Sequence, residues 1–272
     1  MSIHITEYRP IEYLQPYVEL FWKGDFNVTR MAEFRQQVVP NGFLELIIHL
    51  SEQHCDLPYD GNWSKSPDYT IIGLYTKPYE VRFCELVNTF GIRFKPEGIY
   101  NLFGVPASLF SESYDDMEQV LGPSFREYCS KMMEASNCDE MLKLTEKYLL
   151  NQLERNTSEL TYVNYAAEMI RKSEDFNKIE EIPGKVYVSL RQLEREFKNK
   201  IGTTPKRYMR IARLNEVHKK LESNQELELT QVAFDCGYAD QAHFIRDFKS
   251  IMGVNPTLFI KKRDQFIVNH PT

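Results

Sequence analysis

Large apolar residues recur at every fourth position in two stretches near the carboxyl end of the chain. Such spacing places three side chains on one side of a helix and leaves polar residues on the other side. A short apolar stretch and a turn precede each of them, and Gly237 supplies the positive φ that the later turn needs. The pattern predicts two helix-turn-helix units, near residues 179–199 and 229–250. The apolar positions are Leu193, Phe197 and Ile201 in the first unit and Phe244, Phe248 and Met252 in the second.

Both predicted recognition helices have recognisable ends. Asp240 is placed as the N-cap of the second helix, and Ser189 with Gln192 predicts a capping box at the first. Each helix is followed by Gly-x-x-Pro and then an aromatic residue, so the two units align at an offset of 51 residues. Pro205 suits the first turn of a connecting helix that continues to Ser223. At 1.5 Å per residue this connector would be roughly 28 Å long, comparable with the ~34 Å between successive major-groove faces.

The segments LRQLEREFKNKIGTTPKRYMRIARLNEV and VAFDCGYADQAHFIRDFKSIMGVNPTLF resemble the DNA-binding domain of AraC/XylS-type transcription regulators. This resemblance implies two helix-turn-helix units on one long helix, and a cytoplasmic transcription activator whose partners are double-stranded DNA and RNA polymerase. Two features depart from the family pattern. Tyr187 stands where a turn glycine is common, and Pro183-Gly184 should shorten or kink the helix before it. We therefore expect base reading to rest mainly on the second unit.

The first half of the chain has the alternation of apolar and polar residues that is typical of strands. Its strongest signal runs from 38 to 50, where a Pro-Asn-Gly turn precedes Leu44, Leu46, Ile48 and Leu50 on one face. Short strands with regular turns indicate a small barrel or sandwich. The other predicted elements are strands at 17–26, 69–75, 81–83 and 89–94, a short helical turn at 10–14, a polar loop at 54–67, and helices at 114–133 and 139–153.

Two short segments in this half resemble the N-terminal domains of many AraC-type relatives, in which a cupin-like barrel precedes helices. They are PNGFLEL, from Pro40 to Leu46, and GIRFKPEG, from Gly91 to Gly98. The predicted fold class is therefore α+β, with a β-rich cupin-like domain before an all-α DNA-binding domain. We expect a β-rich sensor domain at 1–112, a helical dimerisation or linker segment at 113–155 with a polar linker at 155–159, and the DNA-binding domain at 160–272.

Charge is distributed unevenly along the chain. The net charge of −6 would disfavour nucleic acid if it were spread evenly, but residues 189–220 carry 10 basic and 3 acidic side chains. Positive charge is thus concentrated where the first recognition helix and the connector are predicted. The N-terminus has neither a basic start nor an apolar core, and no run of 18 apolar residues occurs. We therefore expect a cytoplasmic protein that does not span a membrane.

Eight residues are candidates for contact with base edges. Arg191 and Arg195 suit guanine, Gln241 suits adenine, and Arg246 lies one helical turn beyond Ala242. Each has a plainer alternative: a phosphate contact for the arginines, or a surface ion pair of Glu194 with Lys198. The eight are Leu190, Arg191, Glu194, Arg195, Gln241, Ala242, His243 and Arg246.

A second group of residues is placed to contact phosphates. Thr203, Thr204 and Lys206 lie where the connecting helix begins, and a helix N-terminus favours anions. The whole group is Ser189, Lys198, Thr203, Thr204, Lys206 and Asn255. The two helices together predict an asymmetric DNA site of about one and a half to two turns per protomer.

Nothing in the sequence has the spacing of a catalytic or metal site. His49 and His54 are five positions apart without a further ligand pattern, so His49 is interpreted as a core histidine. Trp22 and Trp63 could line an effector pocket, although aromatic residues more often fill a core. The five cysteines show no metal-ligand spacing,. We expect no cofactor and no enzyme activity, a small-molecule effector and a homodimer. The alternatives are an alkyl-transfer repair enzyme with the same DNA-binding domain, and a regulator without an effector.

Overall fold

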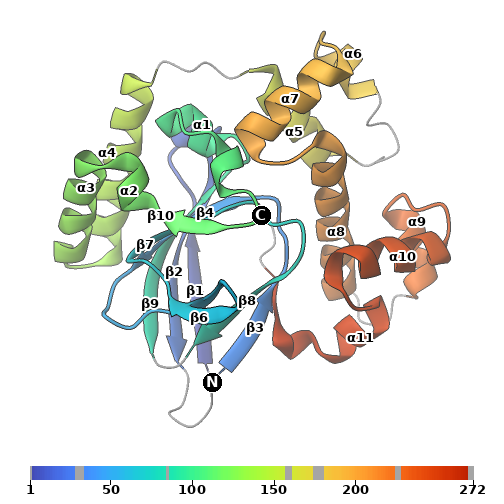
Figure 1. Ribbon diagram of the computed structural model, residues 1–272, viewed down its shortest axis with the longest axis horizontal. Coiled ribbons are helices and arrows are strands. Elements are labelled where there is room, and N and C mark those ends of the chain that lie inside the picture. Colours follow the sequence, from blue (N-terminus) through green and yellow to red (C-terminus); the bar gives the residue numbers. More distant parts are fainter. Residues whose placement is uncertain are drawn as a thin grey trace.

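The computed structural model contains a β-rich domain and a helical region that lies along one side of it (Figure 1). It describes residues 2–27, 34–83, 86–156, 161–173, 181–223 and 228–268. The predicted linker at 155–159 and the start of the first predicted helix-turn-helix unit at 179 therefore lie partly outside the described residues. The α+β fold class predicted from the sequence is confirmed.

The β-rich domain, here called the β domain, consists of two sheets. The larger sheet is antiparallel, with the strand order β1-β2-β9-β4-β7-β10. Its strands are β1 (Ser2–Tyr8), β2 (Val18–Asn27), β9 (Val87–Phe94), β4 (Leu44–His49), β7 (Tyr69–Ile72) and β10 (Tyr114–Asp116).

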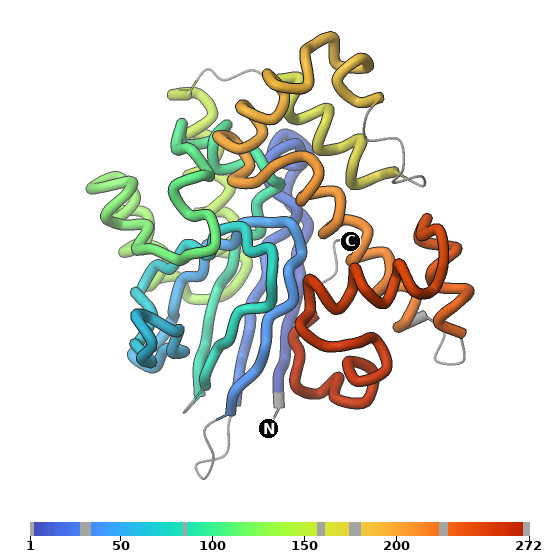
Figure 2. Tube along the Cα trace, turned by 45° about the vertical axis from the view of Figure 1, so that its right-hand side comes forward, coloured from blue at the N-terminus to red at the C-terminus, as the bar shows by residue number. Residues whose placement is uncertain are grey.

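The smaller sheet has the order β11-β3-β8-β5-β6. Its strands are β11 (Phe266–Ile267), β3 (Phe34–Val38), β8 (Tyr79–Phe83), β5 (Asp56–Tyr59) and β6 (Asn62–Lys65). β11 comes from the far end of the chain and pairs with β3 in parallel, whereas the remaining pairs are antiparallel. The last described strand of the chain is thus part of the β domain, as the tube in Figure 2 shows.

Alternate residues of β4 face opposite sides of the larger sheet. Leu44, Leu46 and Ile48 pack in a large buried cluster with the helices of the β domain, and this confirms their predicted common face. The intervening Glu45 and His49 instead face the space between the two sheets. Because side chains on a strand alternate, one strand supplies both a core and a cavity wall.

Helices cover the outer face of the larger sheet. These are η1 (Glu12–Leu14), α1 (Gly98–Phe103), η2 (Ala107–Phe110), α2 (Met117–Leu121), α3 (Pro123–Glu134) and α4 (Cys138–Arg155). α3 packs against α4, and α4 packs against α1. Tyr128 on α3 and Tyr148 on α4 are stacked with their ring centroids 4.4 Å apart.

Two local predictions in this domain were wrong. The region 54–67 is not a loop, because β5 and β6 form a hairpin whose turn contains Asp60 and Gly61 with φ of 48° and 76°. Asp-Gly is a favoured hairpin turn, since both positions require positive φ. The region 114–133 is not one helix either. It contains β10, α2 and α3, and Gly122 with φ of 70° separates the two helices.

The helical region contains both predicted helix-turn-helix units. The first is α6 (Ile182–Lys185) with α7 (Leu190–Ile201), and the second is α9 (Leu229–Asp235) with α10 (Gln241–Met252). The connecting helix α8 (Pro205–Ser223) has the bounds that the sequence predicted. The other elements are α5 (Tyr162–Arg171), α11 (Pro256–Lys261) and η4 (Arg263–Gln265).

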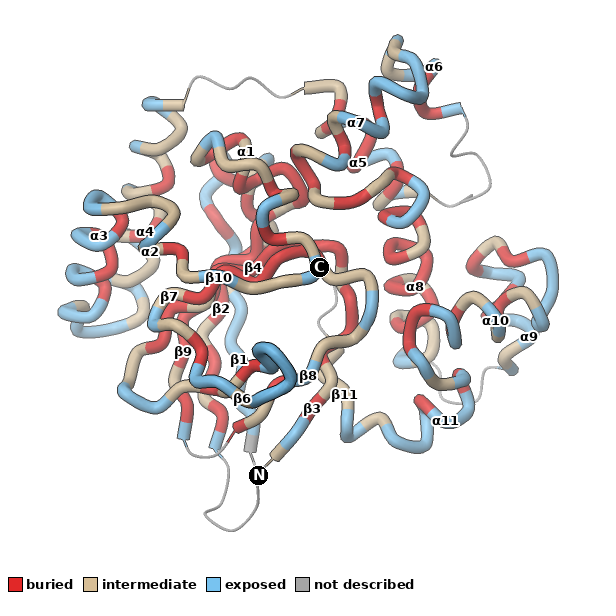
Figure 3. The backbone as a smooth tube through the Cα atoms, viewed as in Figure 1, coloured by how far each residue is buried: buried red, intermediate tan, exposed pale blue. Residues whose placement is uncertain are grey.

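The connecting helix α8 is buried along much of its length (Figure 3). Its first half, with Tyr208 and Ile211, belongs to the same hydrophobic cluster as α7 and the β domain. Its second half, with Leu214 and Val217, belongs to a separate cluster with α9, α10 and α11. One helix therefore joins two different cores.

Candidate nucleic-acid interface and ligand cavity

The recognition helix of the first unit, α7, begins at the predicted residue. Ser189 is its N-cap, and the Ser189 Oγ accepts a hydrogen bond from the backbone N–H of Gln192 at 3.2 Å. The reciprocal half of the predicted capping box is absent, because the Gln192 Nε2 donates to the Tyr162 hydroxyl at 3.3 Å instead. The Gln192 side chain thus links α7 to α5.

The recognition helix of the second unit, α10, repeats this construction. The carboxylate of Asp240 accepts a hydrogen bond from the backbone N–H of His243 at 2.6 Å, as a predicted N-cap should. α7 and α10 each contain 12 residues, and each ends at a glycine in the left-handed conformation, Gly202 or Gly253. The offset of 51 residues is therefore kept at the first helical residue, at the buried face and at the C-cap.

The two recognition helices keep their polar faces in solvent. On α7, Leu190, Arg191, Glu194, Arg195 and Lys198 are all exposed. On α10, Gln241, Ala242 and Arg246 are exposed and His243 is half-buried. Arg195 pairs with the neighbouring Glu196 at 3.2 Å. The alternative ion pair of Glu194 with Lys198 is not formed in the part of the chain that the structure describes.

The candidate phosphate contacts divide into two groups. Lys198 and Lys206 are exposed basic side chains. The other candidates take part in local structure: the Thr204 Oγ1 accepts from the backbone N–H of Arg207 at 3.3 Å, the Asn255 Oδ1 accepts from Leu258 at 2.8 Å, and Thr203 is only 5% exposed. The hydrogen bonds of Thr204 and Asn255 cap the first turns of α8 and α11. The other backbone N–H groups of a first helical turn have no partner within the helix and can bind an anion.

The acidic residues of the second unit have structural partners. Asp247 pairs with Arg210 of α8 at 2.7 Å and accepts a hydrogen bond from the Tyr238 hydroxyl at 3.1 Å. Asp235 pairs with Lys220 at 3.2 Å. These carboxylates are thereby partly neutralised, and they join α9 and α10 to α8.

The first unit is docked on the β domain. α7 packs against η2, and the Ser111 Oγ donates a hydrogen bond to the backbone oxygen of Gly202 at 2.6 Å. Farther along α8, the Asn215 Nδ2 donates to the backbone oxygen of Asn41 at 2.8 Å. The predicted Pro-Asn-Gly turn therefore contacts the connecting helix.

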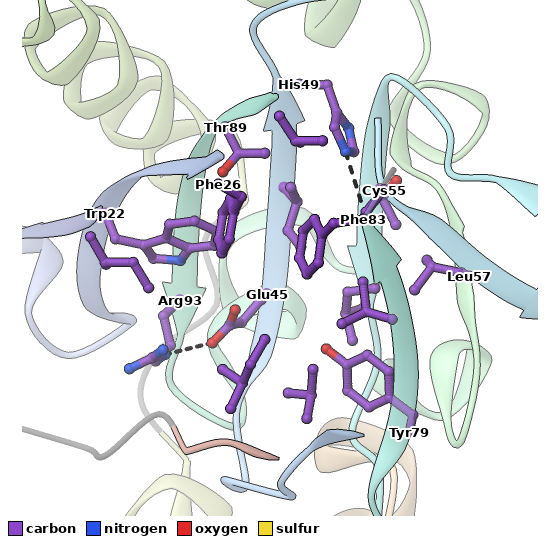
Figure 4. Close-up of a pocket in the computed structure, with 18 of the residues that line it drawn as sticks. Trp22, Phe26, Glu45, His49, Cys55, Leu57, Tyr79, Phe83, Thr89 and Arg93 are labelled. Atoms are coloured by element: carbon purple, nitrogen blue, oxygen red, sulfur yellow. Dashed lines mark hydrogen bonds and ion pairs between the residues drawn. The ribbon is translucent and has the colours of Figure 1, made fainter. Parts of the chain in front are cut away.

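A cavity of about 530 Å³ lies between the two sheets. Figure 4 shows that side chains from both sheets point into it, among them Trp22, Phe26 and Phe83. Most of its lining is apolar, and its volume lies in the range of small-molecule sites. Trp22 belongs both to the buried cluster between the sheets and to the cavity wall. It therefore fills part of the core and also lines the pocket.

One end of the cavity carries a buried ion pair. The Arg93 Nε lies 2.6 Å from the Glu45 Oε1, and these side chains are 3% and 10% exposed. The Trp22 indole lies close by, against Gly91, where an added Cβ would come within 1.9 Å of the ring. The Trp22 Nε1 has no hydrogen-bond partner within the described residues. The indole N–H is thus buried against Gly91.

The other end of the cavity contains His49. Its two ring nitrogens lie 3.4 Å from the backbone oxygen of Asp68 and 3.2 Å from the Ser66 Oγ, and its ring stacks on His54 at 4.0 Å. Burial lowers the pKa of His49 to about 3, so the ring is neutral at physiological pH,. His49 is a buried, hydrogen-bonded histidine, as the sequence indicated.

The three buried cysteines among the described residues are poor nucleophiles. Burial raises the pKa of Cys55 to about 11 and that of Cys236 to about 12, and it also raises the pKa of Cys129. A reactive cysteine needs a lowered pKa. Within the described ranges, no group of three His, Cys, Asp or Glu residues is placed to bind a metal ion, and no helix has the length and apolar character to cross a bilayer. Cys84 lies outside the described residues.

Several cavity residues were not identified as a site from the sequence. Glu45 and Arg93 lie within the two short segments that resembled relatives, which were used only to predict a barrel. Glu45 and Arg93 are register partners on β4 and β9. Their charged side chains in otherwise apolar strands were the available signal, because such residues are rarely buried without a partner.

The carboxyl-terminal region is similar to known helix-turn-helix domains. Residues 184–262 match the family model described as a helix-turn-helix domain. Residues 6–115 match a second model, described as a domain of unknown function (DUF6597).

Two curated relatives match stretches of 85 and 88 residues. The chain is 35% identical over 85 residues to the HTH-type transcriptional activator RhaS of Escherichia fergusonii, which is 31% of this chain and 30% of that protein. It is 33% identical over 88 residues to RhaS of Klebsiella pneumoniae, which is 32% of this chain and 31% of that protein. The chain therefore matches about a third of the length of these curated relatives.

Among solved structures, ToxT from Vibrio cholerae O395 aligns with 89% of this chain and 97% of its own chain. The sequence identity is 13% and the TM-score is 0.48. A second crystal form of ToxT gives 12% identity and a TM-score of 0.49 over 89% of this chain and 98% of that chain.

Proposed function

We propose that this protein is a sequence-specific DNA-binding transcription regulator, and specifically an activator, whose β domain senses an effector. The observation that carries the proposal is the repeated recognition helix. Two capped helices of 12 residues, 51 positions apart, are joined by a helix of 19 residues. Helix-turn-helix units read DNA by inserting such helices into the major groove.

The proposed base contacts are made by the exposed faces of α7 and α10. Arg191, Arg195 and Arg246 can each donate two hydrogen bonds to guanine, and Gln241 can pair with adenine. Lys198 and Lys206 supply phosphate contacts, which add affinity without sequence preference. The partners are double-stranded DNA and RNA polymerase, with a second copy of the chain as a homodimer partner.

Effector sensing is assigned to the cavity between the sheets. Its volume of about 530 Å³ and its apolar lining suit a small molecule,. This cavity favours a regulator with an effector over a regulator whose first domain only dimerises. The raised pKa values of the buried cysteines disfavour the alkyl-transfer alternative,.

Selection of bound fragments from random DNA tests the DNA-binding proposal. We expect one enriched asymmetric sequence, and we expect Arg246→Ala to weaken binding to it by about 1 to 3 kcal/mol while random DNA is affected less. Arg9→Ala is the matched control, since Arg9 is an exposed arginine of the β domain. Absence of any enriched sequence, or an equal loss on random DNA, would contradict base reading by Arg246.

A further inference from the structure

The carboxyl-terminal strand β11 connects the second helix-turn-helix unit to the β domain. Phe266 and Ile267 pair in parallel with Gln37 and Val38 of β3. The backbone N–H of Val39 also donates to the oxygen of Ile267 at 2.9 Å. Just before the strand, the Gln36 Nε2 donates to the oxygen of Asp264 at 3.1 Å. A segment that follows the DNA-binding helices is therefore hydrogen-bonded to the edge of the smaller sheet.

The side chains of residues 266–268 contact both the second helix-turn-helix unit and the β domain. The ring of Phe266 lies 4.8 Å from the ring of Phe259, in the core of the second unit. Ile267 packs on the cluster between the sheets and lines the cavity. Val268 also lines the cavity and packs on the core of the second unit. In Figure 4 the faint red ribbon of β11 passes below the Arg93–Glu45 pair.

We propose that an effector in the cavity uses Ile267 and Val268 as part of its binding site, and thereby holds the second helix-turn-helix unit against the β domain. This inference rests on the proposed effector site and adds its mode of regulation. β11 has two residues, both half-buried, so its docking contributes few contacts of its own. A ligand that touches both walls adds apolar contact only when β11 is docked, and it must therefore shift the equilibrium toward the docked state.

The cavity also indicates the chemistry of the effector. The charge of Arg93 is matched by Glu45, so the site has no unbalanced charge at that end that would require an ion,. Most of the remaining lining is apolar. The expected effector is therefore a neutral, mainly apolar molecule, because a charged group would be costly to bury there without a partner.

The naphthyl ketone Prodan is a suitable probe, since it is uncharged and mainly apolar. In a Trp63→Phe background, Trp22 is the only tryptophan of the chain. Energy transfer from Trp22 then reports Prodan bound near the cavity, and Ile267→Ala tests whether it lies inside. We expect Prodan to bind and to slow hydrogen exchange of the Val39 amide severalfold, because that amide is bonded to Ile267,.

Two variants distinguish direct contact of the effector with the cavity wall from coupling through the docking of β11. Ile267→Ala removes part of the wall and should weaken Prodan binding about fivefold. Gln36→Ala removes the hydrogen bond from β3 to Asp264 but no part of the cavity lining, and it should also weaken Prodan binding, by about twofold to threefold, because docking of the β11 segment is less favourable,. Ile260→Ala is the matched control, since Ile260 lies on α11 and is 48% exposed.

The outcomes distinguish this inference from the function on which it rests. If Prodan does not bind the parent protein, the effector site itself is contradicted, whereas DNA selection can still support the regulator. If Prodan binds but Val39 exchange is unchanged and Gln36→Ala binds normally, the cavity is a ligand site and the coupling through β11 is overturned. Slower Val39 exchange with weaker binding in both variants supports the coupling.

Discussion

The two helix-turn-helix units have the same local construction and different surroundings. Both recognition helices begin at a side-chain cap and end at a glycine, and both bury residues four apart. The core of the first unit is continuous with that of the β domain, whereas the second unit has a separate core to which the β domain contributes Val39. Local sequence therefore sets the shape of a recognition helix, and packing decides which part of the protein restrains it.

This difference assigns different roles to the two units. The first unit is tied to the β domain through α7, η2 and the hydrogen bond from Ser111 to Gly202. The second unit is tied to the β domain through β11, a strand of two residues. A unit held by few contacts opens more readily. The second unit is thus the better placed of the two to move when the β domain changes.

The largest expected effect comes from truncating matched core residues. Phe197→Ala and Phe248→Ala each remove a buried ring at equivalent positions, and each should cost about 3 to 5 kcal/mol of unfolding free energy,. Phe197→Ala should increase hydrogen exchange in α7 and in the β domain. Phe248→Ala should increase it in the second half of α8 and in α9, α10, α11 and β11. If both variants increased hydrogen exchange equally throughout the chain, the two cores would unfold as one cooperative unit.

The docked face of the first unit should also show a pH dependence. Glu97 is buried beside Arg171 and Tyr208, and desolvation raises its pKa from 4.5 to about 8. The folded state therefore holds a proton that the unfolded state releases. This stabilisation is complete below pH 4.5 and is lost as the pH rises through about 8, by at most about 1.4 kcal/mol per unit.

Glu97→Gln removes the ionisable group and keeps the size of the side chain. Urea unfolding at several pH values should show that the decline between pH 4.5 and 8 is smaller in this variant than in the parent protein. A decline of the same steepness would exclude Glu97 as its source. The matched control is Glu52→Gln, because Glu52 is exposed in a loop of the β domain.

The turns of the two units differ in the residue that adopts positive φ. Tyr187 has a φ of 57° and is 95% exposed, so it bears backbone strain without burial to offset it. Tyr187→Gly should therefore stabilise the protein by about 1 kcal/mol, and Gly237→Ala, at a φ of 71°, should destabilise it by about 1 kcal/mol,. Denaturant midpoints measure both changes. A loss of stability in Tyr187→Gly would mean that the tyrosine side chain has a stabilising contact.

The smallest expected effect concerns a single phosphate contact near the first unit. Lys206→Ala should reduce the slope of log K against log salt by about 0.9, the amount for one phosphate. Lys143→Ala on α4 is the control, because Lys143 is exposed and lies outside the helix-turn-helix domain. DNA titrations at several salt concentrations give the slope. An unchanged slope in Lys206→Ala would exclude Lys206 from the phosphate contacts.

Much of the helical domain was predictable because its signals are local. Ser189, Asp240 and Pro205 mark helix starts within a few residues of sequence, and the four-residue spacing marks the buried faces,. The hairpin of β5 and β6 also has a local signal, the Asp60-Gly61 pair, but the polar residues around it are equally typical of a loop. The break at Gly122 was missed because apolar spacing alone does not show where one helix ends.

The sequence alone determined the two recognition helices, their caps, the length of the connector and the alternation along β4, since each depends on residues that are close together in the chain. Only the tertiary structure decided that Glu45 meets Arg93, that one helix joins two cores, and that Ile267 lines a cavity in the β domain. Those contacts join segments that can be more than two hundred residues apart. They depend on how whole sheets and helices pack, which no local pattern of side chains records.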